Sequence, residues 1–267
     1  MLLPVPYFLP LFLEPQGHTV QYKRVADEVK YDFRGQMLTT YAGAIDAPPS
    51  RQVDIGGTLV LKTESRPGGR WVVVTDVSGL KATRSGKAIP AAEAKLAFKG
   101  VWTQTVGGSA SYTAGSNPVL PVAVNAPLWP ISWMPIAADK GMGIGDAWDA
   151  VFTLPAQAFL EDDPVGWFPV KLSFVFNGPD PFDKTLYSMA VRSNHTFDEP
   201  VKHPEVKDLK LTGSVLVDGR LKTRKDDGRL QSANVIMSYD LMLTNDEYPF
   251  GFSKARASVT AVLERIK

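Results

Sequence analysis

The chain has 267 residues, of which 44% are hydrophobic, so it can bury a substantial core without disulfides or metals. It has 29 Lys and Arg against 28 Asp and Glu, and no long block of like charge. This balance argues against nucleic acid or another polyanion as a partner. Cysteine is absent, which excludes disulfides, thiol catalysis and cysteine metal sites but does not identify the compartment.

The first 16 residues are predicted to form an extended apolar arm. The run from Leu2 to Leu13 is apolar, has no positive charge before it and contains Pro4, Pro6 and Pro10. Because dense prolines break a helix, we expect a polyproline-like arm and not an ordinary signal peptide or membrane-spanning helix. Such an arm packs on its own domain or is a start-site remnant, or it contacts a partner protein or a membrane surface. The residues predicted to make that contact are Leu2, Leu3, Val5, Tyr7, Phe8, Leu11 and Phe12.

Two hairpins are predicted in the first half of the chain. Residues 53–63 and 71–77 alternate in polarity on either side of a Pro-Gly-Gly turn, and the Gly56-Gly57 pair indicates a bulge or a tight bend. Residues 101–106 and 109–114 flank a Gly-Gly pair, which is typical of a short hairpin turn.

The middle of the chain is less regular. An alanine-rich run after a proline predicts a short helix over residues 91–98. Residues 115–145, rich in Pro and Gly, predict a long packed loop. This loop either joins two halves, residues 17–114 and 145–267, or caps one continuous sheet. Its many Trp, Met and Ile residues favour the second interpretation, a single β-rich domain.

Strands also dominate the second half. Residues 146–154, 167–176, 185–196 and 253–266 are each predicted as a strand, in addition to a long ribbon over residues 209–243. The whole chain then has about ten strands and little helix. The predicted fold class is all-β, mainly antiparallel: a large curved sheet or half-barrel with long hairpins.

The ribbon from Leu209 to Leu243 has one apolar and one polar face. Its two arms meet at a charged turn with an Asp-Gly pair, the strongest short-range hairpin signal. Leu216 and Ile236 are exceptions, because they fall on the polar face. The apolar face is predicted to cover either a ligand pocket or a plain core, and its main residues are Val215, Val217, Val235, Met237, Tyr239 and Leu241.

No catalytic, cofactor-binding or metal-binding motif is predicted. His195 and His203 flank acidic residues, but their spacing matches no metal-ligand pattern. Asn177, Asp180 and Asp183 have too few oxygens for a calcium loop and predict an Asx-type turn.

Carbohydrate chemistry is the remaining catalytic alternative. Paired carboxylates could come from Asp146, Asp149, Asp162 or Asp163, although no spacing selects a pair. Tryptophan stacks on sugars but equally packs β-sheet cores. The aromatic residues considered for this role are Trp102, Tyr112, Trp129, Trp133, Trp148 and Trp167.

The second half resembles a group of uncharacterised bacterial envelope proteins similar in architecture to the LolA-like lipoprotein fold. The matching residues are Gly145, Asp146, Trp148, Asp227, Gly228 and Leu230. The resemblance implies a curved antiparallel half-barrel with an apolar concave face and a non-catalytic role. The chain departs from that group in having neither an ordinary signal peptide nor a lipobox cysteine.

We therefore expect a non-enzymatic protein of the bacterial periplasm or cell envelope, without a cofactor, that binds an apolar molecule or a partner protein. One alternative is a structural subunit of a membrane-associated assembly, attached through the N-terminal arm. Another is a carbohydrate-binding or carbohydrate-active module.

Overall fold

The computed structural model describes residues 18–19, 27–42, 50–66, 70–77, 80–90, 98–104, 110–113, 141–155, 167–200, 207–244 and 254–266. These residues form strands and turns, and no helix among them is long and apolar enough to span a membrane. The all-β, mainly antiparallel class predicted from the sequence is confirmed.

Fifteen strands are described, more than the ten or so that the sequence indicates. In chain order they are β1 (His18–Thr19), β2 (Asp27–Ala42), β3 (Arg51–Arg66), β4 (Arg70–Val77), β5 (Lys81–Arg84), β6 (Lys87–Ala88), β7 (Phe98–Gln104), β8 (Ala110–Thr113), β9 (Gly141–Met142), β10 (Ala147–Pro155), β11 (Trp167–Pro179), β12 (Leu186–Pro200), β13 (Lys210–Arg224), β14 (Leu230–Thr244) and β15 (Lys254–Arg265).

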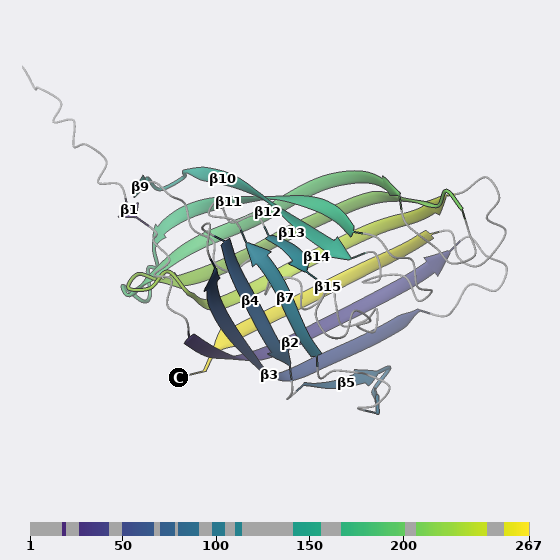
Figure 1. The fold of residues 1–267 in the computed structure, drawn as a ribbon, viewed down its shortest axis with the longest axis horizontal. Coiled ribbons are helices and arrows are strands. Elements are labelled where there is room, and N and C mark those ends of the chain that lie inside the picture. Colours follow the sequence, from purple (N-terminus) through teal and green to yellow (C-terminus); the bar gives the residue numbers. More distant parts are fainter. Residues whose placement is uncertain are drawn as a thin grey trace, which may run out of the picture.

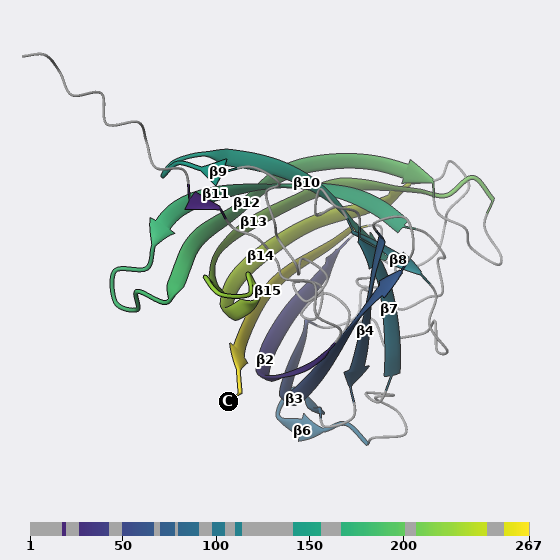
Figure 2. The same ribbon diagram turned by 60° about the vertical axis from the view of Figure 1, so that its left-hand side comes forward.

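Thirteen strands belong to one sheet, and eleven of them pair in a closed ring. From β2 the order is β15, β14, β13, β12, β11, β10, β8, β7, β4 and β3, and β3 pairs again with β2. Every link is antiparallel except that between β10 and β8, a parallel contact of one residue pair, Phe152 with Ala110. Figures 1 and 2 show the long strands β11 to β15 arching over a wall of β3, β4 and β7. The long strands therefore have an inner face, inside the ring, and an outer face.

The sheet forks at β3. Residues 53–56 of this strand pair with β5, whereas residues 60–66 pair with β4. Gly56 and Gly57, predicted to make a bulge or bend, lie where the partner changes, while the pairing with β2 continues without a shift. Gly57 has a φ of 141°, a conformation that side chains disfavour, so glycine suits the fork.

The predicted hairpins are present. Strand β3 pairs with β4, β7 with β8 and β13 with β14, each antiparallel. Strand β15 pairs with β2, so strands from both halves of the chain share one sheet. The turn between β13 and β14 contains the predicted Asp-Gly pair. Gly228 there has a φ of 69°, and its N–H donates to the carbonyl of Arg224 at 2.9 Å.

The inner face forms the hydrophobic core. Buried and exposed side chains alternate along β13 and β15, so residues of one parity point into the ring. Phe152 and Phe174 meet edge to face with ring centroids 6.1 Å apart, and Phe176 packs in the same way on Tyr187 at 5.2 Å. Because burial contributes about 25 cal/mol per Å² of apolar surface, this core is the main source of stability.

The outer face is mostly polar and carries ion pairs between neighbouring strands. Lys171 Nζ lies 2.7 Å from Asp149 Oδ2 across β10 and β11. Arg256 Nε lies 3.0 Å from Asp240 Oδ2 across β15 and β14. Exposed pairs of this kind contribute at most about 1 kcal/mol each, so the outer face is hydrated and adds little to stability.

Several sequence predictions concern residues outside the described ranges. The whole apolar arm, including its predicted contact residues, is among them. So is the helix predicted over residues 91–98, of which Phe98 alone is described, as the first residue of β7. Of the loop predicted over residues 115–145, residues 141–145 are described, and Gly141–Met142 forms β9.

The Asx-type turn predicted between β11 and β12 is present. Asp180 Oδ1 accepts the backbone N–H groups of Phe182 at 2.9 Å and Asp183 at 3.0 Å. Its Oδ2 lies 2.9 Å from Lys222 Nζ on β13, and the Asp180 side chain is 3% exposed. The hydrogen bond from Lys222, with those from the two backbone N–H groups, holds the pKa of Asp180 below its usual value.

Replacing Asp180 with asparagine is expected to reduce the loss of stability in acid. Because its folded pKa lies below the ordinary value of 3.8, the carboxylate stabilises the fold above that pH and ceases to do so as the pH falls through the folded pKa. In urea unfolding, Asp180→Asn should have a lower midpoint than the wild type at neutral pH and a smaller further drop at about pH 3. Asp198→Asn is the control, since that side chain is 60% exposed and 3.7 Å from Lys210. Equal effects of the two substitutions would contradict the prediction.

Candidate functional site

The apolar face predicted on β13 and β14 lies on the inner side of the ring. Its residues are at most 4% exposed, and they are Val215, Val217, Val235, Met237, Tyr239 and Leu241. Val215, Val235 and Met237 are 0% exposed, so they border no space large enough for a water molecule. Burial also raises the pKa of Tyr239, whose hydroxyl donates to Met237 Sδ at 3.2 Å. At these positions the inner face is packed core, and an apolar ligand there stays a prediction.

The described residues contain no group of three or more His, Asp or Glu side chains placed to hold a metal ion. His195 is half-buried on β12, where it pairs with Val215 of β13. His203, considered with it for a metal site, lies outside the described ranges.

Carboxylates and aromatic residues considered for carbohydrate chemistry have structural partners where they are described. Asp146 accepts the backbone N–H of Gly143 at 2.8 Å, and Asp149 pairs with Lys171. Of the aromatic set, only the side chain of Trp148 falls in the described part. Its ring stacks on Phe174 with centroids 5.4 Å apart and packs against the core. Asp162, Asp163, Trp129 and Trp133 lie outside the described ranges.

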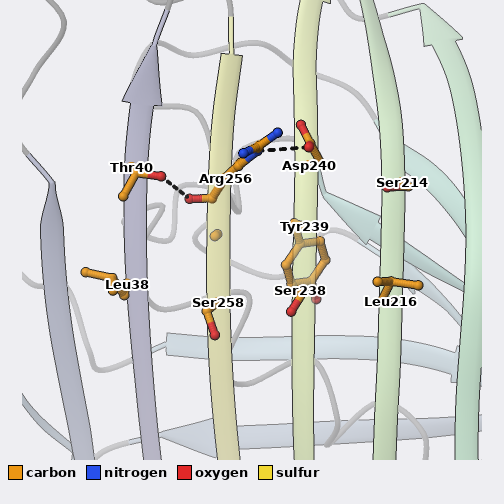
Figure 3. Close-up of a pocket in the computed structure, with 10 residues that line it drawn as sticks. Leu38, Thr40, Ser214, Leu216, Ser238, Tyr239, Asp240, Arg256 and Ser258 are labelled. Atoms are coloured by element: carbon orange, nitrogen blue, oxygen red, sulfur yellow. Dashed lines mark hydrogen bonds and ion pairs between the residues drawn. The ribbon is translucent and has the colours of Figure 1, made fainter.

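A groove on the outer face crosses β2, β15, β14 and β13. Leu38, Ser258, Ser238 and Leu216 follow one another across these strands as directly paired residues. At about 4.8 Å per strand, the two leucines stand about 14 Å apart with the two serines between them. Leu38 is 43% and Leu216 49% exposed. The small serines leave a hollow of about 400 Å³ between the leucines (Figure 3). We call this hollow the outer-face groove.

Charged side chains lie at one end of the outer-face groove. Thr40, Arg256, Asp240 and Ser214 form the next row across the same four strands. Arg256 Nε donates to Asp240 Oδ2 at 3.0 Å, and the Thr40 hydroxyl donates to the Arg256 carbonyl at 3.4 Å (Figure 3). The side chain of Arg256 is 77% exposed and that of Asp240 51%, so both can contact a bound molecule.

The outer-face groove was not predicted, although the sequence contains a signal for it. Leu216 and Ile236 are the two aliphatic residues on the polar face of the ribbon, and Leu38 likewise falls on the exposed parity of β2. Ile236, 54% exposed, extends the apolar surface one row beyond Ser238. Sequence alone could not show that these residues share a surface, because this depends on the pairing of β2 with β15.

A second hollow, of about 520 Å³, lies on the outer face at the fork of the sheet. Its lining comes from β2, β3, β5 and β15 and includes Arg34, Gln36, Asp54 and Lys81. Gln36 Nε2 donates to Asp54 Oδ1 at 2.7 Å. Among the described residues, this second hollow is not bordered by two exposed aliphatic side chains that face each other. The outer-face groove is therefore the better candidate for a binding site.

No protein-family model and no curated protein matches the sequence of this chain. Among solved structures it is similar to mutants of the Rh. blastica porin. One is 9% identical with a TM-score of 0.23, and another is 11% identical with a TM-score of 0.24. Each match covers 90% of this chain and 100% of that chain. At such TM-scores the similarity supports no conclusion about this chain.

Proposed function

We propose that this chain is a non-enzymatic binding protein of the bacterial envelope that holds a partner protein in the outer-face groove. The observation that carries the proposal is the row Leu38, Ser258, Ser238 and Leu216, in which two exposed leucines flank two serines. Apolar surface grouped on a polar face and rimmed by polar residues is typical of an interaction site. The envelope location rests on the resemblance of the second half to envelope proteins.

The shape of the groove favours a protein over a small molecule. Its volume of about 400 Å³ falls in the range of small-ligand sites, which makes a free apolar molecule the competing occupant. Small-ligand sites, however, enclose most of the ligand surface, whereas Leu38 and Leu216 are themselves 43% and 49% exposed. A shallow groove fits one aliphatic side chain that projects from a larger surface.

The polar groups of the groove define what surrounds that side chain. The hydroxyls of Ser238 and Ser258 can donate to or accept from the partner's peptide groups. Arg256 and Asp240, paired at 3.0 Å and exposed, offer a donor and an acceptor at one end. The expected partner segment is therefore an aliphatic residue flanked by exposed peptide or polar groups.

A catalytic role is less well supported by this arrangement. The charged side chains Arg256 and Asp240 neutralise each other, and the described lining contains no histidine to activate Ser238 or Ser258. The one carboxylate of the described lining, Asp240, is already paired with Arg256, so the groove offers contacts more readily than a general base for the serines.

Site-specific crosslinking in cells of the native host tests the proposal. A photo-crosslinking residue such as p-benzoylphenylalanine at Ser258 should form a discrete protein adduct that disappears when Leu216→Ser is added. The matched control is the same residue at Val151, which is 43% exposed like Leu38 but lies on β10. Equal amounts of adduct at positions 258 and 151, or no adduct at position 258, would count against the outer-face groove as the binding site for a partner protein.

A further inference from the structure

We propose that the end of the molecule carrying Ile144 and Phe182 docks on a lipid bilayer, with both side chains inserted at the membrane interface. This is a different surface from the outer-face groove. Phe182 is 93% exposed and Ile144 70%, the two most exposed large hydrophobic side chains in the described part of the chain.

A turn fixed by hydrogen bonds and an ion pair holds Phe182 in its exposed position. Asp180 accepts the Phe182 N–H at 2.9 Å, and this carboxylate is buried and tied to β13 through Lys222 at 2.9 Å. Lys225 N–H donates to the Thr185 carbonyl at 2.9 Å, which ties the same turn to the one between β13 and β14. The ring is therefore presented to solvent by a fixed backbone.

Ile144 belongs to the same end of the molecule. It follows β9, and the N–H of Gly145 donates to the Phe176 carbonyl at 2.8 Å. A Cβ added to Gly178 would lie 2.8 Å from Ile144 Cγ1, so the isoleucine covers the backbone just before the Phe182 turn. Glycine at position 178 is thus what lets Ile144 lie there. Two exposed apolar side chains on neighbouring loops form a pair of anchors.

The strand that follows the apolar arm in the sequence, β1, lies at this end. His18 of β1 pairs with Met142 of β9, two residues before Ile144. Figures 1 and 2 both place β1, β9 and the β11–β12 turn at one end of the molecule. The 17 residues that precede β1 include the apolar run from Leu2 to Leu13. The apolar run therefore precedes, in the sequence, a strand that lies at the same end as Ile144 and Phe182.

Charges of both signs lie at this end. The exposed carboxylates are those of Asp146, Asp183 and Asp226, and Asp226 is paired with Arg224. Lys184, next to the Phe182 turn, is exposed and makes no ion pair with another described residue. Lys225 lies over the Tyr187 ring at 5.0 Å from its centroid. Lysines beside aromatic and aliphatic anchors are typical of interfacial lipid binding, since they contact anionic headgroups while the anchors enter the acyl boundary.

Docking at this end leaves the outer-face groove accessible. The groove residue Asp240 lies ten positions along β14 from Leu230, which is next to the β13–β14 turn. At about 3.3 Å per residue this is about 33 Å, beyond the depth of an interfacial contact. A membrane-docked molecule can therefore still hold a partner.

Single-site labelling of the full-length chain tests the proposal, because the chain contains no cysteine and an introduced one is unique. An environment-sensitive dye on Phe182→Cys should shift to the blue on mixing with phosphatidylglycerol–phosphatidylethanolamine vesicles. The same dye on Val151→Cys should not respond. In vesicle flotation, the double variant Ile144→Ser/Phe182→Ser should bind about tenfold or more less tightly than the wild type. Leu216→Ser, which removes a side chain of 49% exposure in the groove, should leave vesicle binding unchanged.

Three results would overturn the proposal. One is the absence of vesicle binding by the wild type. Another is vesicle binding with no response from the dye at position 182, which would mean that another surface docks. The third is a dye response that depends on protein concentration and not on lipid, which would assign this end to a second copy of the chain. Circular dichroism of each variant checks that binding is compared between folded proteins.

Discussion

Gly213→Ala is expected to lower the free energy of unfolding by about 3 kcal/mol or more. Gly213 lies on β13 between Phe197 of β12 and Leu241 of β14, and its φ is 155°. A Cβ at this position would lie 2.0 Å from the carbonyl oxygen of Asp240, a backbone atom that cannot rotate away. The two strands would have to separate near the open end of the β13–β14 hairpin.

Gly86→Ala is the matched control for this substitution. Gly86 also has a positive φ, 78°, but an added Cβ would meet nothing within 4 Å. Gly86→Ala should therefore lower the free energy of unfolding only by the penalty for placing alanine at a positive φ, about 1–2 kcal/mol. Urea denaturation of both variants measures the difference. A similar loss in both would show that β13 and β14 do not approach each other as described.

Met237→Ala should lower the free energy of unfolding by about 2–5 kcal/mol, whereas the neighbouring Ile236→Ala should change it by less than about 0.5 kcal/mol. Met237 is 0% exposed on the inner face, and Ile236 is 54% exposed on the outer face. Consecutive strand residues point to opposite faces, so the pair compares the two sides of β14 at one place.

This comparison also separates packed core from ligand pocket on the inner face. A packed core cannot collapse fully around the deleted side chain, which is why the loss is large. Chemical denaturation of the purified variants provides both values. If Met237→Ala were nearly neutral, the inner face would be plastic or open, and the apolar ligand predicted for it would regain support.

Alternation of polarity predicted the long strands well because each has one buried face and one solvent-exposed face. The ribbon is the clearest case, since β13 and β14 pair from Lys210 with Thr244 to Thr223 with Leu230. The turn chemistry was equally informative: Asp180 and Asp183 accept N–H groups within their own turn, as local side-chain bonding predicts.

Long-range pairing was not predictable in the same way. The ring depends on β2 pairing with β15, as in Tyr31 with Arg265, and no local pattern specifies partners so far apart in the sequence. The β5–β6 hairpin was also missed. Its turn is made by Ser85 and Gly86, both with positive φ, and this Ser-Gly pair is a turn signal that the sequence did contain.

The candidate site shows the same division between local and long-range information. Leu216 and Ile236 stood out locally as exceptions to the alternation of the ribbon. Their neighbour across the groove, Leu38, is brought beside them only through β15, where Ser258 pairs with both Leu38 and Ser238. Without knowledge of the strand order, Leu216 and Ile236 could be recognised only as isolated apolar residues on a polar face.

The affinity of the purified chain for the partner captured at Ser258 tests the central claim most directly. Calorimetric titration should show binding at least about tenfold weaker for Leu216→Ser than for the wild type, because the contact that Leu216 buries in the complex is lost. Val151→Ser, with a side chain of similar exposure outside the groove, should bind like the wild type. Equal affinities of all three proteins would contradict the proposal that the outer-face groove is the binding site.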